Sequence, residues 1–393
     1  MRIAQLTYST KPRGGVVHTL ALSEALAARG HDVEIWTLGR GGDRAFFRDL
    51  DPRVQVRVVP FVSREDESVG DRIERSIAAL GAAFDTGADV VHAQDCISAN
   101  AVLDAGVAPI RTIHHLDAFT TPRLVSCHER AIHAPAARIC VSRAVADEVE
   151  AAYGYRAAVI LNGVDAGRFA RAAGPEGAPA RDAWTARLGG YVLALGGIEP
   201  RKGTIDLLEA FARLARRDLQ LVIGGGETLF DYRDYRARCD ARARELGVSP
   251  LVLGPVDDDE LPALVAGAQV LGFPSTKEGF GLAAMEALAA GVPVVARDLP
   301  VLREVFGDTV RYGSDVDGLA AALDAALSDR PCHAEPGREL AAGYTWARTS
   351  TSATSTRRRP ERSSLRAEHE KPRLRRSTKP LRSRGSSGDP RIG

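Results

Sequence analysis

The sequence predicts an α/β protein built from two doubly wound domains, and three observations carry that prediction. With 393 residues, the chain is long enough for two domains of ordinary size. Strand-like segments alternate with Gly-rich turns and helical segments, which is typical of a parallel sheet covered by helices on both faces. This alternation stops near Asn162 and begins again at Tyr191, so we expect two domains that face each other across a cleft.

The first half of the chain supplies the strands of one sheet. Apolar residues after Gly14-Gly15 recur with a helical period and predict a helix that continues to Arg29. Strands are predicted at Ile3–Tyr8, His31–Leu38, Val54–Pro60 and Ala88–His92, in a segment that ends at His114-His115, and in ARICVSRAVADEV before a helix that starts at Ser142.

The second half repeats this organisation. A strand at Tyr191–Leu195 leads into Gly196-Gly197, a polar loop and a helix from Thr204 to Arg217. Further strands are predicted at Gln220–Ile223, Leu251–Leu253, Val270–Phe273 and Val292–Ala296. We therefore divide the chain into a first domain at residues 1–165, a linker at 166–190 that is rich in Gly, Ala, Pro and Arg, a second domain at 191–346, and a tail at 347–393.

The tail has a different composition from the rest of the chain. It is rich in Ser, Thr, Arg and Pro and lacks apolar periodicity, which predicts a disordered segment that does not pack. The tail holds 14 Lys+Arg against 4 Asp+Glu, a net charge of +10, whereas residues 1–346 carry −9.

The overall composition excludes several classes of protein. Hydrophobic residues make up 45% and charged residues 26%, which argues against a disordered or fibrous chain. The five cysteines are scattered and form no C-x-x-C pair, so neither a disulfide framework nor a zinc cluster is predicted. The N-terminus resembles no secretory signal, and no apolar run approaches ~18 residues, so we expect a cytoplasmic protein without a transmembrane helix.

The segment FPSTKEGFGLAAMEALAAGVPVVA, residues 273–296, carries the strongest functional signal. Glu278 lies in a loop after a strand, and Gly279 and Gly281 let the backbone approach a ligand at the start of a helix. Glu286 follows eight residues later in an apolar run, where a buried carboxylate needs a partner such as a sugar hydroxyl. The alternative is that both acids are solvated charges on a loop and a helix surface.

The segment LALGGIEPRKGTIDLLEAF, residues 193–211, places Arg201 and Lys202 directly before a helix. Two adjacent cations suit a diphosphate, whose charge must be neutralised when it leaves. An exposed Arg-Lys pair on a loop is also common without any ligand.

Two features of the first domain complete the candidate site. Gly14 and Gly15 follow a strand and open a helix, so a substrate can lie against bare backbone at the positive helix end. A dinucleotide site is the rival interpretation, but the G-x-G-x-x-G spacing is missing. The segment RTIHHLDAF ends a strand with His114, His115 and Asp117, where such sheets present ligand-binding groups, although a structural histidine is the alternative.

The pattern E-x7-E followed by GVPVVA resembles the signature of retaining glycosyltransferases of family 4 (glycosyl transferases group 1). The resemblance covers residues 1–346 and implies the GT-B fold, in which two Rossmann-like domains face a cleft, the first on the acceptor side and the second holding a nucleotide sugar. It also implies that an amphipathic helix after a Y-x-W such as Tyr344-Thr345-Trp346 crosses back to brace the first domain. Here ARTSTSATSTRRRPERSS follows, which offers no apolar face.

The resemblance assigns roles to the candidate residues. Glu278 would bind the donor sugar, Glu286 the nucleotide ribose, Lys202 the diphosphate, and His114 a position near the donor sugar. The Gly14-Gly15 loop would approach the diphosphate and the acceptor. Gly197 stands where the family usually has an Arg, so Arg201 is expected to supply the guanidinium. The predicted site residues are His114, Glu278 and Lys202 for catalysis, and Gly14, Gly15, Gly197, Arg201, Lys202, Glu278, Gly279, Phe280, Gly281 and Glu286 for donor binding. VSRAV and LNGVD match family stretches near the crossover between the domains.

The resemblance therefore implies a hexosyltransferase that moves a sugar from a UDP-, GDP- or ADP-sugar to a small-molecule, lipid or glycan acceptor. The reaction would be a front-face substitution that retains the anomeric configuration, without a metal or another cofactor. No nucleic-acid partner is expected, and peripheral association with a membrane is allowed.

Two other classes of function stay open. A nucleotide-sugar epimerase or a phosphorylase could use the same fold, although each needs additional groups that the sequence does not place. Alternatively, a catalytically impaired body could serve as a scaffold whose basic tail binds polyanions such as nucleic acid or an anionic membrane.

Overall fold

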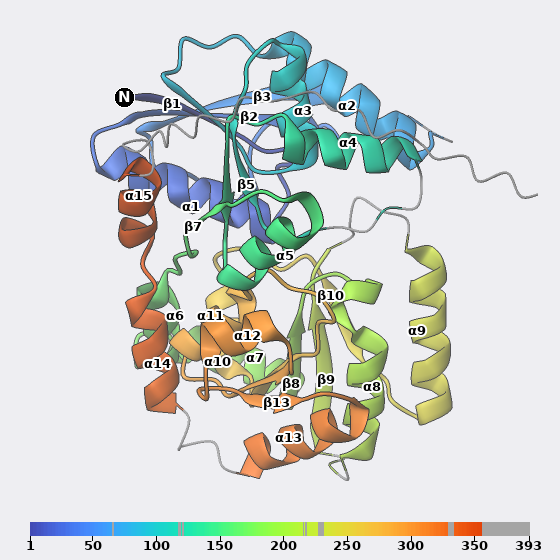
Figure 1. Ribbon diagram of the computed structural model, residues 1–393. Coiled ribbons are helices and arrows are strands. Elements are labelled where there is room, and N and C mark those ends of the chain that lie inside the picture. Colours follow the sequence, from blue (N-terminus) through green and yellow to red (C-terminus); the bar gives the residue numbers. More distant parts are fainter. Residues whose placement is uncertain are drawn as a thin grey trace, which may run out of the picture. The chain divides into compact units, whose positions relative to one another are not determined.

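The computed structural model describes residues 1–64, 67–116, 119, 122–214, 216, 218–226, 232–328 and 334–355. Among these residues the chain forms two parallel sheets, each covered by helices on both faces (Figure 1). The predicted α/β class with two doubly wound domains is confirmed.

In the described part of the chain, the first sheet has seven parallel strands in the order β3-β2-β1-β4-β5-β6-β7. Its strands are β1 (Arg2–Leu6), β2 (Asp32–Arg40), β3 (Val54–Phe61), β4 (Val90–Ala93), β5 (Ile110–Ile113), β6 (Ala137–Cys140) and β7 (Ala158–Val159). The chain order reverses at β1, which pairs with β2 on one side and β4 on the other. At such a switch point the carboxyl ends of the two strands open a crevice that can hold a ligand.

Alternating side chains attach helices to both faces of this sheet. Ile3 and Ile35 pack with α1 (Gly14–Ala28), whereas Ala4 and Trp36 pack with α2 (Val69–Ala83) and α3 (Cys96–Asp104). The remaining helices are α4 (Pro122–His133) and α5 (Arg143–Tyr153). Because successive residues of a strand point to opposite faces, near-continuous apolar strands indicate a sheet that is buried on both sides.

Within the described residues, the second sheet has six parallel strands in the order β10-β9-β8-β11-β12-β13. They are β8 (Gly190–Leu195), β9 (Leu219–Gly224), β10 (Leu251–Gly254), β11 (Val270–Phe273), β12 (Val294–Arg297) and β13 (Arg311–Gly313). The order reverses at β8, which lies between β9 and β11. The second sheet therefore repeats the switch point of the first.

The helices of this half also lie in two layers. One face carries α8 (Thr204–Arg213), α9 (Arg233–Leu246) and α13 (Val316–Ser328). The other carries α6 (Ala166–Ala173), α7 (Ala178–Leu188), α10 (Leu261–Gly267), α11 (Leu282–Ala289), α12 (Pro300–Phe306) and α14 (Ala334–Gly343). A short 3-10 turn, Pro200–Lys202, connects β8 to α8. None of the described helices is long and apolar enough to cross a membrane.

Residues 166–190, predicted as a linker, contain α6 and α7. Each helix is anchored by one buried side chain, Phe169 in α6 and Leu188 in α7, which join the core beneath the second sheet. The sequence analysis missed these helices because they contain few large apolar residues. Ala and Arg favour a helix but do not produce the periodic apolar pattern of a buried face.

The chain passes between its two halves at two adjacent segments. Asn162-Gly163-Val164 leads from the first half to the second, and Tyr344-Thr345-Trp346 leads back. The amide of Val164 donates a hydrogen bond of 3.0 Å to the carbonyl of Tyr344. A Cβ on Gly163 would collide with the backbone of Trp346, so the two segments pack against each other directly.

The prediction that the tail starts unpacked at residue 347 is wrong for its first nine residues. Trp346–Ser355 forms helix α15, which lies beside α1 (Figure 1). Thr349 and Ser350 are buried, and the hydroxyl of Thr349 donates to the carbonyl of Leu161 at 2.9 Å. Hydroxyls that donate to backbone carbonyls can be buried at little cost, so this helix packs without the apolar face that we expected. Residues 356–393, and the predicted disorder there, lie outside the described residues.

Candidate functional site

The loop between β11 and α11 forms the centre of the candidate site. Gly281 adopts a left-handed conformation (φ 97°) immediately before α11, where a side chain would also press on the ring of Phe306. Phe280 is 2% exposed and its ring packs edge-on against Tyr344, 5.5 Å between centroids. The buried side chain of Phe280 therefore fixes the loop to the protein interior. Because this side chain is buried, only the backbone of Phe280 can contact a ligand.

Three charged side chains from two loops converge above β8 and β11. The ammonium of Lys202 lies 2.5 Å from Oε1 of Glu278, and Arg201 donates from Nη1 to the same oxygen at 3.3 Å. Arg201 also donates from Nη2 to buried Glu199 at 2.9 Å. The structure thus brings Glu278 to the adjacent residues Arg201 and Lys202, although Glu278 lies 76 residues after Lys202 in the sequence.

The two cations determine the ionisation of Glu278. Burial alone would raise the pKa of its carboxyl, but the charges of Lys202 and Arg201 outweigh burial and lower that pKa to about 2. Glu278 is therefore ionised at neutral pH. In this arrangement the carboxylate serves as the counter-ion of a cation pair that could also receive phosphate oxygens.

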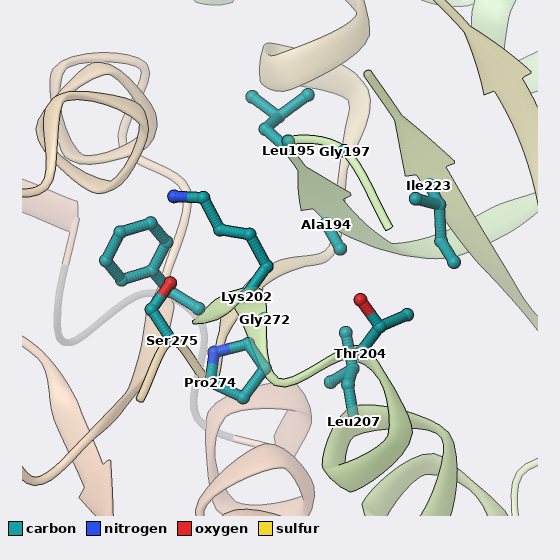
Figure 2. Close-up of a pocket in the computed structure, with 12 residues that line it drawn as sticks. Ala194, Leu195, Gly197, Lys202, Thr204, Leu207, Ile223, Gly272, Pro274 and Ser275 are labelled. Atoms are coloured by element: carbon teal, nitrogen blue, oxygen red, sulfur yellow. The ribbon is translucent and has the colours of Figure 1, made fainter. Parts of the chain in front are cut away.

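Lys202 borders a small hollow at the carboxyl ends of β8 and β11. Figure 2 shows the Lys202 side chain among the residues that line the hollow, which include Ser275 and Gly197. A Cβ on Gly225 would collide with the backbone of Gly196, so the two glycine loops at this edge touch. Gly197 lies in the wall of the hollow, whereas Arg201 does not line it. That Arg201 supplies the missing guanidinium stays a prediction.

Glu286 lies on the second turn of α11, in a different part of the site. No hydrogen bond or ion pair to its carboxylate occurs within the described residues. Burial raises its pKa to about 8, an effect that Asp258 and Asp165 increase and that Arg168 opposes. Arg168 itself is engaged by Asp258 at 2.8 Å. Glu286 is therefore a partly buried carboxyl group whose hydrogen-bonding capacity is unused.

The first domain contributes the start of α1. Arg13 precedes this helix with extended backbone and makes no capping hydrogen bond, which leaves the amides of the first turn without a side-chain cap. A Cβ on Gly14 would meet nothing within 4 Å, whereas one on Gly15 would lie 3.7 Å from the ring of His114. Gly14 therefore faces open space and Gly15 lies against His114.

His114 follows β5 and belongs to a buried polar network. Its Nε2 lies 3.2 Å from the amide oxygen of Gln94, and its ring packs edge-on against His18 at 4.9 Å between centroids. Burial, followed by the charges of His18 and Arg111, holds the pKa of His114 well below its usual range. The imidazole is neutral at physiological pH and can bind a hydroxyl without adding positive charge. His115 is half-buried, and Asp117 lies outside the described residues.

The two halves of the site meet at one close contact. A Cβ on Gly279 would collide with the carbonyl oxygen of His114. Only glycine therefore permits the loop that carries Glu278 to approach the end of β5. This contact places the two predicted catalytic segments side by side.

Sequence reasoning missed three residues of this site. Glu199, buried beside Arg201, could have been suspected from its position two residues before a cation pair. Gln94 and His18 gave no such signal, because each becomes a neighbour of His114 only in the folded chain. Nδ1 of His18 lies 2.9 Å from the side-chain oxygen of Asn162, which connects α1 to the crossover segment. In the described part of the chain, no group of three or more His, Cys, Asp or Glu side chains is placed to hold a metal ion.

Comparison with known families decides the identity of the chain. The family described as "Glycosyl transferases group 1" matches residues 189–340, and "Glycosyltransferase Family 4" matches residues 12–168. A D-inositol 3-phosphate glycosyltransferase of Xylanimonas cellulosilytica is 30% identical over 416 aligned residues, which cover 92% of this chain and 98% of that protein. The chain belongs to the group 1 glycosyltransferases. A glycogen synthase of Mycobacterium tuberculosis is 32% identical over 372 residues, covering 84% of this chain and 86% of the relative.

Solved glycosyltransferase structures share the same two-domain GT-B fold. A sucrose-phosphate synthase from Thermosynechococcus elongatus superimposes with a TM-score of 0.74 at 20% identity, covering 91% of this chain and 98% of the other. HepE of Anabaena, in complex with UDP and glucose, has a TM-score of 0.69 at 19% identity, covering 92% and 99%. The predicted GT-B architecture of this glycosyltransferase is thereby confirmed.

Proposed function

We propose that this glycosyltransferase moves a hexosyl group from a nucleoside-diphosphate sugar to an acceptor hydroxyl and retains the anomeric configuration. The observation that carries the proposal is the convergence of Lys202 and Arg201 on Glu278 beside the hollow at β8 and β11. Two cations next to a cavity suit a diphosphate leaving group, and the ionised carboxylate can accept hydrogen bonds from sugar hydroxyls. The complex of HepE with UDP and glucose supports this donor class.

Each candidate residue has a role in the proposed reaction. Lys202 and Arg201 neutralise the charge that develops on the diphosphate, Glu278 orients the sugar, and neutral His114 binds a sugar hydroxyl from the opposite side. Glu286 would bind the ribose hydroxyls, which would satisfy its unused carboxyl oxygens. The amides around Gly14 and Gly15 would approach the phosphates.

The proposed chemistry is a front-face substitution. The bond between C1 of the sugar and the diphosphate oxygen breaks, and a bond from C1 to the acceptor oxygen forms on the same face. The proton of the acceptor hydroxyl passes to the departing phosphate oxygen. Because Lys202 and Arg201 supply the compensating charge, we propose that the reaction needs no metal, and EDTA should leave the rate unchanged.

A thermal-shift screen against UDP, GDP, ADP and their common sugar conjugates tests the proposal. We expect one nucleoside diphosphate to raise the melting temperature, and Glu286→Ala to lose most of that increase. Proton NMR of the glycoside formed from the stabilising donor then reports its anomeric configuration. Folded protein that no nucleotide stabilises, or a product with inverted configuration, would contradict the proposal.

A further inference from the structure

Two cysteines of the first domain meet where helix α4 packs on helix α3. Cys96 is the first residue of α3, and Cys127 lies in the middle of α4. Both residues are half-buried and reduced, and both border the apolar core that involves α2 and α3. Their thiols are joined by a hydrogen bond. The fold therefore pairs two thiols that the scattered cysteines of the sequence did not indicate.

The buried side-chain amide of Asn100 fixes the backbones that carry the two thiols. Its Nδ2 donates to the carbonyl of Cys96 at 2.8 Å and to the carbonyl of Cys127 at 2.9 Å. The same nitrogen lies 3.3 Å from Sγ of Cys127. Because one nitrogen contacts both carbonyls, the two backbones lie side by side, and such proximity is what a disulfide requires.

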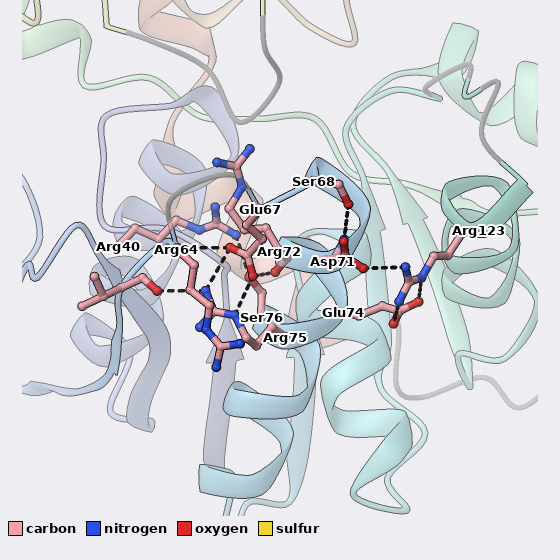
Figure 3. Close-up of polar contacts among 11 residues, drawn as sticks. Arg40, Arg64, Glu67, Ser68, Asp71, Arg72, Glu74, Arg75, Ser76 and Arg123 are labelled. Atoms are coloured by element: carbon pink, nitrogen blue, oxygen red, sulfur yellow. Dashed lines mark hydrogen bonds and ion pairs between the residues drawn. The ribbon is translucent and has the colours of Figure 1, made fainter.

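Ion pairs near both ends hold α4 in this position. Near the start of the helix, Arg123 donates to Asp71 of α2 at 2.8 Å (Figure 3). Near its end, Nη1 of Arg130 donates to Asp104 of α3 at 2.7 Å. Exposed pairs add little stability, but one at each end limits how far the helix can slide. The helix therefore presents Cys127 to α3 in one position.

The two thiols differ in their ionisation. A hydrogen bond from Cys96 lowers the pKa of the Cys127 thiol, and the charge of Arg130 adds to this effect, although burial and two nearby acids oppose it. The same hydrogen bond, followed by burial, raises the pKa of Cys96 well above its usual range. Because the thiolate attacks an oxidant, Cys127 is the expected nucleophile and Cys96 the thiol that resolves the product.

Two other cysteines provide a contrast. Cys140 is 0% exposed, and burial raises its pKa to about 12. Cys239 is 3% exposed, and burial raises its pKa to about 11. Buried thiols with raised pKa values react slowly, so these two residues serve as internal controls for oxidation. Cys332 lies outside the described residues.

We propose that Cys96 and Cys127 form a reversible disulfide when the protein meets a peroxide. The Cys127 sulfur attacks a peroxide oxygen, so that an S–O bond forms, the O–O bond breaks, and the other oxygen leaves as hydroxide and takes up a proton. The Cys96 sulfur then attacks the sulfenic acid on Cys127. An S–S bond forms, the S–O bond breaks, and a second water leaves with the proton of Cys96. Each sulfur loses one electron, and both electrons reduce the peroxide to two waters.

This modification site goes beyond the proposed function and does not depend on the identity of the donor. The bond would attach α4 to the start of α3, where Asp95 caps the helix and accepts the amide of Tyr8 at 2.9 Å. Helix α4 itself follows the segment that begins with His114 at the end of β5. Oxidation would therefore restrain the first-domain side of the candidate site.

Peptide mapping after oxidation tests the proposal. The full chain is treated with a tenfold excess of hydrogen peroxide, alkylated in urea and digested with trypsin, which releases Cys96 in peptide 76–111 and Cys127 in peptide 124–130. We expect the two peptides to appear linked, with their summed mass less two hydrogen atoms, and dithiothreitol given before alkylation to prevent this. Cys140 and Cys239 should be alkylated as free thiols.

Substitutions assign the role of each thiol. In Cys96→Ser, oxidation should stop at the sulfenic acid of Cys127, which dimedone labels, whereas Cys96 in Cys127→Ser should take up about tenfold less dimedone. Combining Cys127→Ser with Ser126→Cys moves the thiol to an exposed position on α4 and should abolish the link. Cys332→Ser should form the link as the wild type does.

The proposal is wrong if the folded chain yields no linked peptide, or if Cys332 replaces either cysteine in the link. An equal yield from protein oxidised in urea would show that the pairing does not depend on the fold, and it would overturn the proposal as well. Stabilisation by a nucleoside diphosphate is measured separately on the reduced protein. The proposed function and this inference can therefore fail independently.

Discussion

The carboxylate of Glu304 caps a helix of the other domain at Arg143. Glu304 lies on α12 and accepts hydrogen bonds from the amides of Arg143 at 2.6 Å and Ala144 at 2.8 Å, the first two residues of α5. A carboxylate at the start of a helix satisfies free amides and opposes the helix dipole. This pair therefore fastens α5 of the first domain to α12 of the second.

Replacing Glu304 should loosen the contact between the domains. We expect Glu304→Ala to lower the free energy of unfolding by about 1 kcal/mol, the usual value of an N-terminal cap. Small-angle scattering should show a larger radius of gyration, because the domains separate more often. Glu339→Ala, at an exposed position on α14, provides the control. Unchanged scattering in Glu304→Ala would show that other contacts hold the domains together.

Removing the ammonium of Lys202 should impair the chemical step. We expect Lys202→Gln to reduce kcat/KM by about 10²–10³, because one preorganised group that stabilises the departing charge is lost. Steady-state release of the nucleoside diphosphate measures the effect. Lys277→Gln removes a neighbouring cation whose partner is Glu148 at 3.8 Å, and it should retain most activity. Equal losses in both variants would indicate a general effect of charge.

A methyl group at Gly279 should separate the two halves of the site. The Cβ of Gly279→Ala would collide with the His114 carbonyl, so the loop must shift at a cost of about 1–3 kcal/mol. We expect lower thermal stability and weaker nucleotide binding. Gly343→Ala, whose Cβ would meet nothing within 4 Å, should have neither effect. Tight nucleotide binding by Gly279→Ala would show that the donor does not need this contact.

The raised pKa of Glu286 predicts a pH-dependent gain in stability on substitution. With a pKa of about 8 in the folded protein, above its usual value of 4.5, this group favours folding fully below pH 4.5 and loses that contribution as the pH rises through 8. The free energy of unfolding of Glu286→Gln should therefore match that of the wild type at pH 5 and exceed it by about 1–3 kcal/mol at pH 9. Urea unfolding at both values measures the difference, and the same difference at both would refute it.

The lowered pKa of His18 predicts the opposite trend. Burial lowers this pKa to about 4, and the bond to Asn162 opposes that change only in part. The stability that neutral His18 contributes is present above pH 6.5 and is lost as the pH falls through 4. When the pH falls from 7 to 4.5, the free energy of unfolding of the wild type, measured in urea, should fall by about 2–3 kcal/mol more than that of His18→Gln. His133→Gln, at an exposed position, should show the same dependence of the free energy of unfolding on pH as the wild type.

Most strands could be predicted from the sequence, because each depends on a local pattern, but the short strands β7 and β13 were missed. Val270–Phe273 is a short apolar run before a Gly-rich loop, and the structure has a strand with those bounds. The pairing of Lys202 with Glu278 depends instead on two loops that meet only when β8 and β11 lie side by side. Their proximity follows from the sheet order, which one sequence does not reveal.

The helix at Trp346–Ser355 was missed for a different reason. Periodicity detects a helix by its apolar face, and this helix presents Thr349 and Ser350 to the protein instead. Its attachment depends on the hydroxyl of Thr349, which donates to the carbonyl of Leu161, and on the single large apolar side chain of Trp346. Hydrogen bonds between residues that are distant in the sequence produce no periodic pattern of apolar residues. The sequence of this segment was therefore interpreted as a solvated tail.

The paired crossings at Gly163 and Trp346 restrict how the protein can open. A single connecting segment would let the domains rotate in every direction. Two connecting segments that are hydrogen-bonded side by side favour rotation about one axis. The carbonyl of Tyr344, which accepts a hydrogen bond from the amide of Val164, joins the two crossings. We expect rotation of the domains about the two crossings to separate the Glu278 loop from the end of β5. Because one direction of rotation is favoured, each closure would bring that loop back to the same place.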